Sequence, residues 1–388
     1  MEMASPVTAL NTPLAETHLA AGAKMGAWFG CALPDDFGDA AAEYRCAGET
    51  VALIDKNYRA YLSFTGPDRV RYLNAILTNN IKDLRDGQGN VSLLLTPQGH
   101  ILAEIETHAF PDRLFCVSYA MIRERLIEVL EKFIIMDDVT LTDDTPRYVS
   151  LALEGPQSAA LVNDLTGIDL EQLSDHASVD AEILRSAQDD TVRKNLVQGS
   201  IPCRMVKRLT GGVPGAEFFV ETEKLAELWR ILSEATRSHG GGPMGYTALS
   251  ALRLAQGVPW FGYDFGEKQI PHEAGLQDSH ISYTKGCYTG QEIVERVRSR
   301  GQVNRRRVEL LFSGDAVPEA GAVLTMDGKE MGYVTRSAKI PGAAGSVGTR
   351  VIGMGYVRKE GTAPGATLQW AGGTATAAQF PEALQTSR

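Results

Sequence analysis

The sequence predicts an α+β protein with two ferredoxin-like lobes and a C-terminal β-barrel. First, a strand, a Gly-Pro break and an amphipathic helix occur in that order twice, at residues 60–77 and 148–165. Second, each copy continues into further strands and a long amphipathic helix, and a repeated strand-helix-strand-strand-helix unit is typical of paired ferredoxin-like lobes. Third, helical periodicity ends near Arg305, where short strands begin to dominate.

Length and charge narrow the class of protein further. At 388 residues the chain is longer than one hydrophobic core usually serves, so two or three domains are expected. The net charge of −10 disfavours extensive binding of nucleic acid. No uncharged apolar run approaches the roughly 18 residues of a membrane helix, and no basic segment leads into an apolar one at the N-terminus. We therefore expect a cytoplasmic protein with no membrane partner.

The first lobe is predicted from alternating and helical patterns between residues 60 and 133. Residues 60–65 alternate as in a strand, and Gly66-Pro67 then opens a helix with apolar residues on one face up to Leu77. Strands are expected at residues 91–95, 100–108 and 114–118, and an amphipathic helix at residues 122–133.

The second lobe repeats this order. A strand at residues 148–153 is followed by Gly155-Pro156 and by a helix at residues 159–165. The strands expected next are residues 203–209 and 217–220, followed by a helix at residues 225–232 and another at residues 248–255. A cleft between two lobes is a natural ligand site.

The barrel is predicted from five short strands, residues 308–312, 323–326, 330–335, 351–357 and 367–370. Asp327-Gly328 joins two of them and tolerates the positive φ angles of a two-residue hairpin turn. Residues 341–348 are rich in Gly and Ala, so we expect a surface loop within the barrel.

The cysteines indicate a reducing compartment. The five residues Cys31, Cys46, Cys116, Cys203 and Cys287 are odd in number, scattered and never spaced as Cys-x-x-Cys. This usage does not fit a self-contained zinc or cluster site.

The segment with the clearest chemistry is an octet, residues 285–292, with the sequence Lys-Gly-Cys-Tyr-Thr-Gly-Gln-Glu. Thr289 and Glu292 have the spacing of a capping box, which predicts a helix that starts just after Cys287. The helix N-terminus and the charge of Lys285 would both favour the thiolate of Cys287. The alternative is a buried cysteine in a tight turn, where Gly286 and Gly290 serve shape alone.

Six arginines follow the octet in an otherwise acidic chain: Arg296, Arg298, Arg300, Arg305, Arg306 and Arg307. Arg296 lies four residues after Glu292, and Arg298 lies three residues after Glu295. This spacing is compatible with a solvent-exposed helix face that is held by salt bridges. The alternative is a site for phosphate, a polyglutamate tail or an acidic partner protein.

Two further positions suit a pterin ring, whose amino group and ring N–H one carboxylate can accept together. Glu217 opens a strand after a flexible turn and is one candidate, although an ordinary surface glutamate is the alternative. Arg253 lies among leucines in a helix, where it is either buried with an acidic partner or placed on the helix surface.

Taken together, these segments resemble the glycine-cleavage T-protein (aminomethyltransferase) superfamily, and the octet resembles the signature of its YgfZ-type folate-binding branch. The resemblance implies three domains in a ring around a central folate pocket, with tetrahydrofolate as cofactor. It places a pterin-binding glutamate at Glu217 and a folate-associated arginine at Arg253. The other matching segments are Gly22–Met25, Tyr44–Gly48, Gly87–Gly89, Gly99, Leu252–Leu254, Gly257, Pro259, Gly262, Pro271 and Glu273–Leu276.

The resemblance also implies domain bounds and partners. We expect a folate-binding region at residues 16–300, with a first lobe at about 50–145 and a second at about 146–300, and a barrel domain at residues 305–383. The YgfZ-type branch implies iron–sulfur client or assembly proteins as partners, with tRNA modification among the processes served.

The sequence departs from the transferase pattern at two points. Aminomethyltransferases carry paired aspartates after a glycine pair, whereas this chain has Ala103-Glu104 after Gly99-His100. An asparagine expected in a folate-binding position is replaced by Tyr119. Transfer of an aminomethyl group needs a carboxylate at the reacting nitrogen, so the departures disfavour glycine cleavage.

The leading hypothesis is therefore a tetrahydrofolate-binding protein that uses Cys287 and Lys285 in assembly or repair of iron–sulfur clusters. The first alternative is a folate-dependent aminomethyl or one-carbon transferase with Glu104 as the acid/base. Glu217, Arg253 and Tyr119 are the predicted cofactor-binding residues in either case. Nucleic-acid binding through the arginines is the least favoured reading because the basic segment is small.

Overall fold

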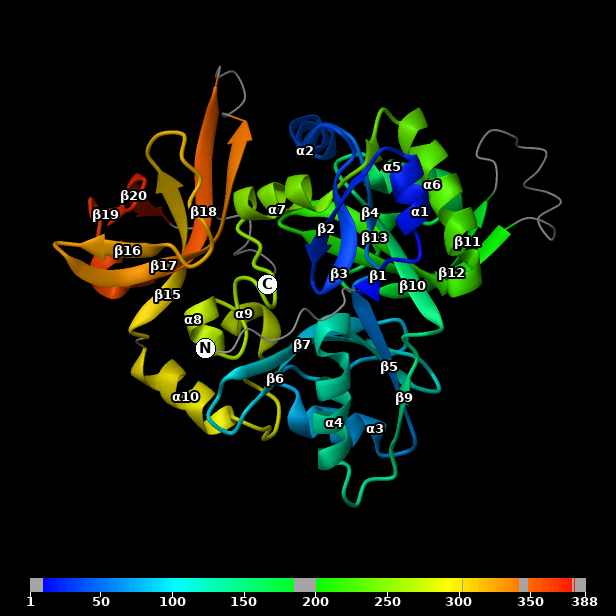
Figure 1. The fold of residues 1–388 in the computed structure, drawn as a ribbon. Coiled ribbons are helices and arrows are strands. Elements are labelled where there is room, and N and C mark those ends of the chain that lie inside the picture. Colours follow the sequence, from blue (N-terminus) through cyan, green and yellow to red (C-terminus); the bar gives the residue numbers. More distant parts are fainter. Residues whose placement is uncertain (1–9, 185–199, 302, 342–347, 379, 381–388) are drawn as a thin grey trace. The chain divides into compact units, whose positions relative to one another are not determined.

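The computed structural model describes residues 10–184, 200–301, 303–341, 348–378 and 380 (Figure 1). The chain divides into two compact units, which we call unit 1 (residues 1–72, 83–90 and 106–249) and unit 2 (residues 73–82, 91–105 and 250–388). The predicted α+β class with a C-terminal β-barrel is confirmed. The predicted loop at 341–348 falls largely on residues 342–347, which lie outside the described residues.

The chain passes from one unit to the other at five points, one in the loop at residues 82–83 and four within helices or strands. The four elements are helices α3 (Arg69–Ile76) and α7 (Tyr246–Ala255) and strands β6 (Gly89–Leu95) and β7 (Ile101–Ala109). Unit 2 is therefore assembled from three separate segments of the sequence.

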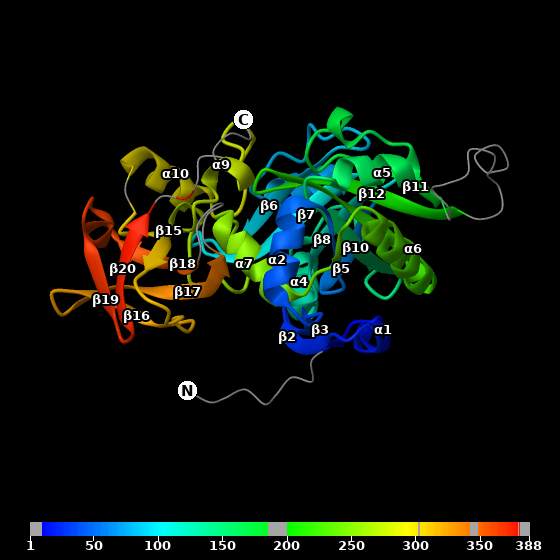
Figure 2. The same cartoon turned by 90° about the horizontal axis from the view of Figure 1, so that it is seen from above.

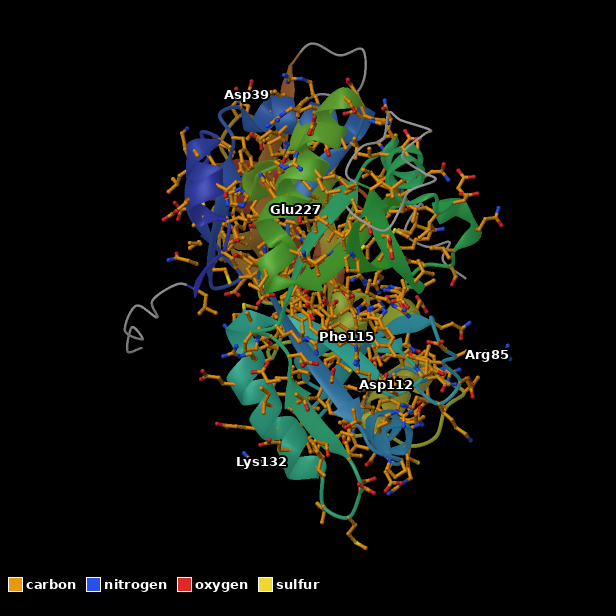
Figure 3. All side chains as sticks on the ribbon, turned by 90° about the vertical axis from the view of Figure 1, so that its right-hand side faces the viewer. Asp39, Arg85, Asp112, Phe115, Lys132 and Glu227 are labelled. Atoms are coloured by element: carbon orange, nitrogen blue, oxygen red, sulfur yellow. The ribbon has the colours of Figure 1, made fainter. Side chains whose placement is uncertain are left out.

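The first-lobe sheet has the strand order β6-β7-β8-β5-β9, with β5 (Arg59–Thr65), β8 (Leu114–Tyr119) and β9 (Thr140–Asp143) in unit 1. The predicted helix at 122–133 is α4 (Arg123–Phe133). Figure 3 labels Phe115 on β8 among packed side chains, whereas Lys132 on α4 projects outward.

The second-lobe sheet has the order β11-β12-β13-β10-β4-β14. Its antiparallel core consists of β10 (Tyr148–Glu154), β12 (Ser200–Thr210) and β13 (Val213–Glu221), and β11 (Ser178–Leu184) extends it. Helices α5 (Ser158–Thr166) and α6 (Leu225–Ser238) pack on this sheet and share one apolar core with it (Figures 1 and 2). We attribute the stability of this lobe mainly to that burial.

Several elements of unit 1 do not follow from the sequence patterns. Strand β4 (Ala52–Asp55) has no alternation because all four of its residues are buried, and it pairs with β10 rather than with its neighbour β5. A small N-terminal sheet has the order β1-β3-β2. The remaining elements are β1 (Leu10–Asn11), α1 (Ala15–Ala20), β2 (Lys24–Trp28), β3 (Cys31–Asp36), α2 (Ala40–Glu49) and β14 (Gly242–Pro243).

The six-stranded barrel of unit 2 closes in the order β15-β18-β17-β16-β19-β20 (orange and red in Figure 1). Asp327 and Gly328 both have positive φ, at 52° and 74°, as predicted for the hairpin turn. The last strand was not predicted because its sequence, Gly-Thr-Ala-Thr-Ala-Ala, has no large apolar residue. The bounds are β15 (Arg305–Phe312), β16 (Val323–Met326), β17 (Lys329–Pro341), β18 (Thr349–Arg358), β19 (Thr367–Trp370) and β20 (Gly373–Ala378).

Three helices of unit 2 precede the barrel: α8 (Pro271–Ala274), α9 (Gln277–His280) and α10 (Gln291–Arg300). The octet begins in the loop between α9 and α10 and ends in the first turn of α10, which carries Arg296, Arg298 and Arg300, while the other three arginines open β15. None of the described helices is long and apolar enough to cross a membrane.

Candidate functional site

Glu217 lies in the interior of unit 1 and accepts hydrogen bonds from three side chains. The guanidinium of Arg59 donates to both carboxylate oxygens, from Nε to Oε1 at 3.3 Å and from Nη2 to Oε2 at 3.0 Å. Arg208 donates to Oε2 from Nε and Nη2, at 3.1 and 2.9 Å. The Ser150 hydroxyl donates to Oε1 at 2.8 Å. Glu217 is only 1% exposed, so the surface alternative is wrong.

A second carboxylate turns these contacts into a closed network of four charged side chains. Glu106 on β7 accepts from Nη1 of Arg59 at 3.0 Å and also forms an ion pair with Arg208. Burial alone would raise the pKa of Glu217, but the charges of Arg59 and Arg208 outweigh it and the pKa is lowered. Both glutamates are therefore ionised at neutral pH.

The charged network limits how Glu217 can meet a ligand. Its two oxygens already accept five hydrogen bonds, which exceeds the roughly four lone-pair sites of a carboxylate. A pterin, which brings two donors, would therefore have to replace the Ser150 hydroxyl together with arginine N–H groups. Sequence patterns did not identify Arg59, Arg208 or Glu106. The signal that could have identified them is a charged residue inside a strand whose neighbours are apolar and buried.

Tyr119 lies at the end of β8, directly opposite Arg59 in the β5–β8 register. Its ring stacks on Tyr58 with centroids 5.8 Å apart and lies 5.6 Å from the ring of Phe29. Arg59 in turn lies over the Tyr58 ring at 5.5 Å. Unit 1 therefore places Tyr119 in an aromatic group that adjoins the Glu217 network.

Arg253 belongs to the part of α7 in unit 2. Its side chain is buried and donates from Nη1 to the side-chain oxygen of Gln256 at 2.9 Å. The helix-surface alternative is therefore wrong. Its predicted role toward folate stays a prediction.

Glu104 of unit 2 forms a close contact with a histidine that sequence patterns did not single out. His280 Nε2 lies 3.0 Å from Glu104 Oε1, and His280 Nδ1 lies 2.7 Å from the Ser279 hydroxyl. The His280 backbone is fixed because its carbonyl accepts from the Thr78 hydroxyl at 2.6 Å. Glu104 is thus held beside an imidazole that can accept or return a proton.

The octet does not start a helix where the capping-box pattern predicted. Helix α10 begins at Gln291, its N-cap is Gly290, and no side chain caps it, so that prediction is wrong. Gly290 has φ +82°, and a Cβ there would lie 2.6 Å from the Thr96 carbonyl oxygen. Because the chain turns at this glycine, Thr289 cannot take the N-cap position, and Cys287 lies outside the first helical turn.

Lys285 contacts backbone rather than an acidic group. Its ammonium donates to the carbonyl oxygens of Asn74 at 2.6 Å, Leu77 at 2.5 Å and Asn79 at 3.0 Å. These carbonyls lie at and just beyond the C-terminal end of α3, where a positive charge is favourable. Burial lowers the pKa of Lys285 to about 8, so the ammonium is still charged at neutral pH. Lys285 therefore fastens the octet to α3.

Comparison with known proteins identifies the family of this chain. A family model described as the GCVT N-terminal domain matches residues 14–279, more than half of the chain. The chain belongs to the GCVT N-terminal domain family. The predicted membership of the T-protein superfamily is thus confirmed.

Similar proteins extend the match of this GCVT-family chain to nearly its whole length. It is 26% identical over 358 residues to an aminomethyltransferase of Streptomyces avermitilis, which covers 92% of this chain and 91% of that protein. An aminomethyltransferase of Herpetosiphon aurantiacus is 28% identical, with 90% and 91% covered. The crystal structure of glycine cleavage system aminomethyltransferase T from Bartonella henselae has the same fold, with a TM-score of 0.80, 23% identity, and 96% and 97% covered.

Among the five cysteines of this GCVT-family chain, Cys287 alone is exposed. Burial raises the pKa of Cys31 to about 11 and that of Cys116 and Cys203 to about 12. Cys46 is half-buried and its sulfur lies 3.2 Å from the Thr50 hydroxyl. Cys287 is therefore the thiol that a partner can reach. No three His, Cys, Asp or Glu side chains of the described residues gather as a metal site would require.

Replacement of Lys285 by Met in this GCVT-family chain is expected to lower the free energy of unfolding by about 1.5–3 kcal/mol, because three partly buried carbonyls lose a charged donor. Methionine keeps the apolar stem, so packing changes little. Urea unfolding at pH 7 measures the effect. Lys268→Met, at an exposed lysine of the same unit, is the control. Equal stability of the Lys285 variant and wild type would show that the ammonium does not fasten the loop.

Proposed function

We propose that this protein binds tetrahydrofolate and transfers a one-carbon unit in the manner of the aminomethyltransferases that it resembles. The similarity over about nine-tenths of both chains carries this proposal. The family model and the common fold support it. Glycine cleavage with a lipoyl-bound aminomethyl donor is the reaction to test first.

The residues of unit 1 fit one end of a folate. Glu217 offers an ionised, buried carboxylate to the amino group and ring N–H of a pterin, once the Ser150 hydroxyl and some of the arginine N–H groups are displaced. Tyr119 and Tyr58 offer aromatic faces near that carboxylate, because Arg59 contacts both the Tyr58 ring and Glu217. In unit 2, Arg253 offers a buried guanidinium to an anionic group. Bound tetrahydrofolate would supply the nitrogen that accepts the one-carbon unit.

The acid/base role falls to Glu104. Its carboxylate would take or give the proton at the reacting nitrogen, the part that an aspartate plays in the transferase pattern. The imidazole of His280, 3.0 Å away, holds the carboxylate in place and can share its proton at Nε2. The extra methylene of glutamate relative to aspartate is accommodated because His280 fixes the end of the longer side chain.

A second candidate function is support of iron–sulfur enzymes, as in the YgfZ-type branch, with Cys287 as the reacting or cluster-contacting group. One observation favours it: Cys287 is exposed on a loop that Lys285 anchors, whereas the other four thiols are buried or half-buried. Tetrahydrofolate binding belongs to both candidates.

One assay separates the two functions. The purified protein is mixed with a lipoyl-carrier aminomethyl donor and tetrahydrofolate, and methylene-tetrahydrofolate and ammonia are measured. Formation of both supports the transferase. If neither forms although tetrahydrofolate binds, the transferase proposal fails. A deletion strain is then tested for iron–sulfur enzyme activity, with rescue by wild type but not by Cys287→Ser expected for the second candidate.

A further inference from the structure

A cavity of about 410 Å³ lies in unit 2 beside the arginine cluster, and no step of the proposed function uses it. Its walls come from α8, α9, α10 and the start of β15. Its polar lining includes Arg298, Arg306, Arg307, His272, Gln277 and Tyr283. We propose that this cavity binds a small organic anion through a carboxylate or phosphate group.

Arg307 is a partly buried cation that donates to backbone carbonyls rather than to an acidic side chain. Its Nε donates to the Ala274 carbonyl at 2.7 Å and its Nη1 to the Gly257 carbonyl at 3.1 Å. No carboxylate of a described residue forms an ion pair with it. Burial lowers the pKa of Arg307 to about 10, which the charge of Asp264 offsets only in part. A partly buried cation that contacts carbonyls, the Met354 sulfur at 3.3 Å and the Phe380 ring at 4.4 Å, but no carboxylate, still attracts an anion.

Arg298 is held by an aromatic ring instead of a strong ion pair. Its guanidinium lies 4.2 Å from the centroid of the Tyr283 ring. Its contact with Glu295 is 3.5 Å long and solvent-exposed, and such pairs contribute little. A guanidinium stacked on a ring keeps its N–H edge free for a planar carboxylate or a phosphate.

Two lining residues also have buried polar atoms that lack a hydrogen-bond partner among the described residues, His272 Nδ1 and Gln277 Oε1. His272 Nε2 lies 3.2 Å from the Tyr283 hydroxyl, and burial raises the pKa of Tyr283, so the phenol keeps its proton. When that phenol donates to Nε2, the neutral imidazole carries its proton on Nδ1. The Nδ1–H is then a further donor for an anion.

The two carboxylates of the lining do not cancel this charge. Glu273 forms an ion pair with Arg305, whose Nε donates to Glu273 Oε1 at 3.1 Å. Asp278 is exposed and accepts from the Gln277 amide at 3.1 Å. The Arg298–Glu295 pair is one of the two contacts that the salt-bridged alternative expected, whereas Arg306 and Arg307 remain available to a ligand.

The test is calorimetric titration of the full-length protein at low ionic strength with two probes, inorganic phosphate and citrate. Saturable binding of one probe near one per chain is expected, and the stronger probe identifies phosphate or carboxylate as the recognised group. Arg306→Gln and Arg298→Gln should each weaken binding at least about fivefold, because each removes a charge-assisted hydrogen bond. Both residues are on the surface, so these variants should fold as wild type does.

The matched control is Arg296→Gln, at an exposed arginine of α10 that does not line the cavity. It should keep the dissociation constant within about twofold, as expected for screened surface charge. Any one of three results would overturn the proposal. The first is that neither probe binds, and the second is that Arg296→Gln weakens binding as much as Arg306→Gln. The third is that saturating tetrahydrofolate displaces the anion, which would make this cavity part of the folate site. Since none of these results depends on transfer activity, the proposal stands or falls apart from the proposed function.

Discussion

Glu217→Gln is expected to lower the free energy of unfolding by about 3–5 kcal/mol, because removal of one charge from a buried network leaves two guanidinium groups without full compensation. Glutamine has nearly the same shape, so the loss reflects charge rather than a cavity. Arg59 and Arg208 would each lose a charged acceptor within about 3 Å. Urea or thermal unfolding at pH 7 provides the measurement.

The control variant lies on the same strand. Glu221→Gln removes a carboxylate that pairs with Arg147 at 2.8 Å, where both side chains are more than half exposed. Its effect should stay below about 1 kcal/mol, as is usual for surface ion pairs. Similar losses in the two variants would mean that the Glu217 network contributes no more than a surface pair. Tetrahydrofolate affinity must be compared under conditions where both variants remain folded.

The same network sets the acid sensitivity of the fold. The pKa values of Glu106 and Glu217 are lowered in the folded state, whereas an unfolded glutamate titrates near about 4.3. Their contribution is therefore fully present above about pH 4.3 and is lost as pH falls through the lower folded values. Glu217→Gln should flatten this part of the stability curve, because one of the two carboxylates no longer titrates.

The second large effect is expected in activity. Glu104→Gln should lower the rate of methylene-tetrahydrofolate formation by roughly 10²–10⁴, since an amide cannot exchange a proton with the reacting nitrogen. The glutamine oxygen can still accept a hydrogen bond from His280, so the fold and the folate dissociation constant should change little. Steady-state kinetics and a separate folate titration give the two quantities.

Glu319→Gln, at an exposed glutamate of the barrel unit, controls for the loss of a negative charge and should keep full activity. His280→Gln removes the imidazole but keeps a side chain that can donate to Glu104. It should reduce the rate less than Glu104→Gln and alter its pH profile. Wild-type turnover in Glu104→Gln would remove this carboxylate from the reaction, whatever else the protein does.

The sequence predicted most of the lobe and barrel elements because periodicity and turn residues are local signals. The side chains that surround Glu217 could not be predicted in this way. Arg59 and Glu106 come from β5 and β7 of the first-lobe sheet and Arg208 comes from β12 of the second-lobe sheet, so only contact between strands of different sheets brings them together. His280 likewise reaches Glu104 from a distant part of the sequence.

The octet shows a second reason why a local sequence pattern can fail to predict the structure. The spacing of Thr289 and Glu292 favours a capping box, but the fold places the Thr96 carbonyl against Gly290 and moves the helix start. Lys285 was interpreted as a charge that acts on its neighbour Cys287. Its three carbonyl partners lie more than 200 residues earlier in the chain, so no local pattern could have revealed them.

This long separation has a consequence for synthesis on the ribosome. The segments 73–82 and 91–105 of unit 2 leave the exit tunnel well before residues 250–388, which complete that unit. With translation at about 5–20 residues per second, the intervening residues 106–249 impose a delay of roughly 7–30 s. During that interval the carbonyls of Asn74, Leu77 and Asn79 have no ammonium to bind, and Leu95 lacks its neighbour Gly290. We therefore expect the nascent chain to need chaperones until Lys285 emerges, and a stalled or truncated product to be recovered in the aggregated fraction.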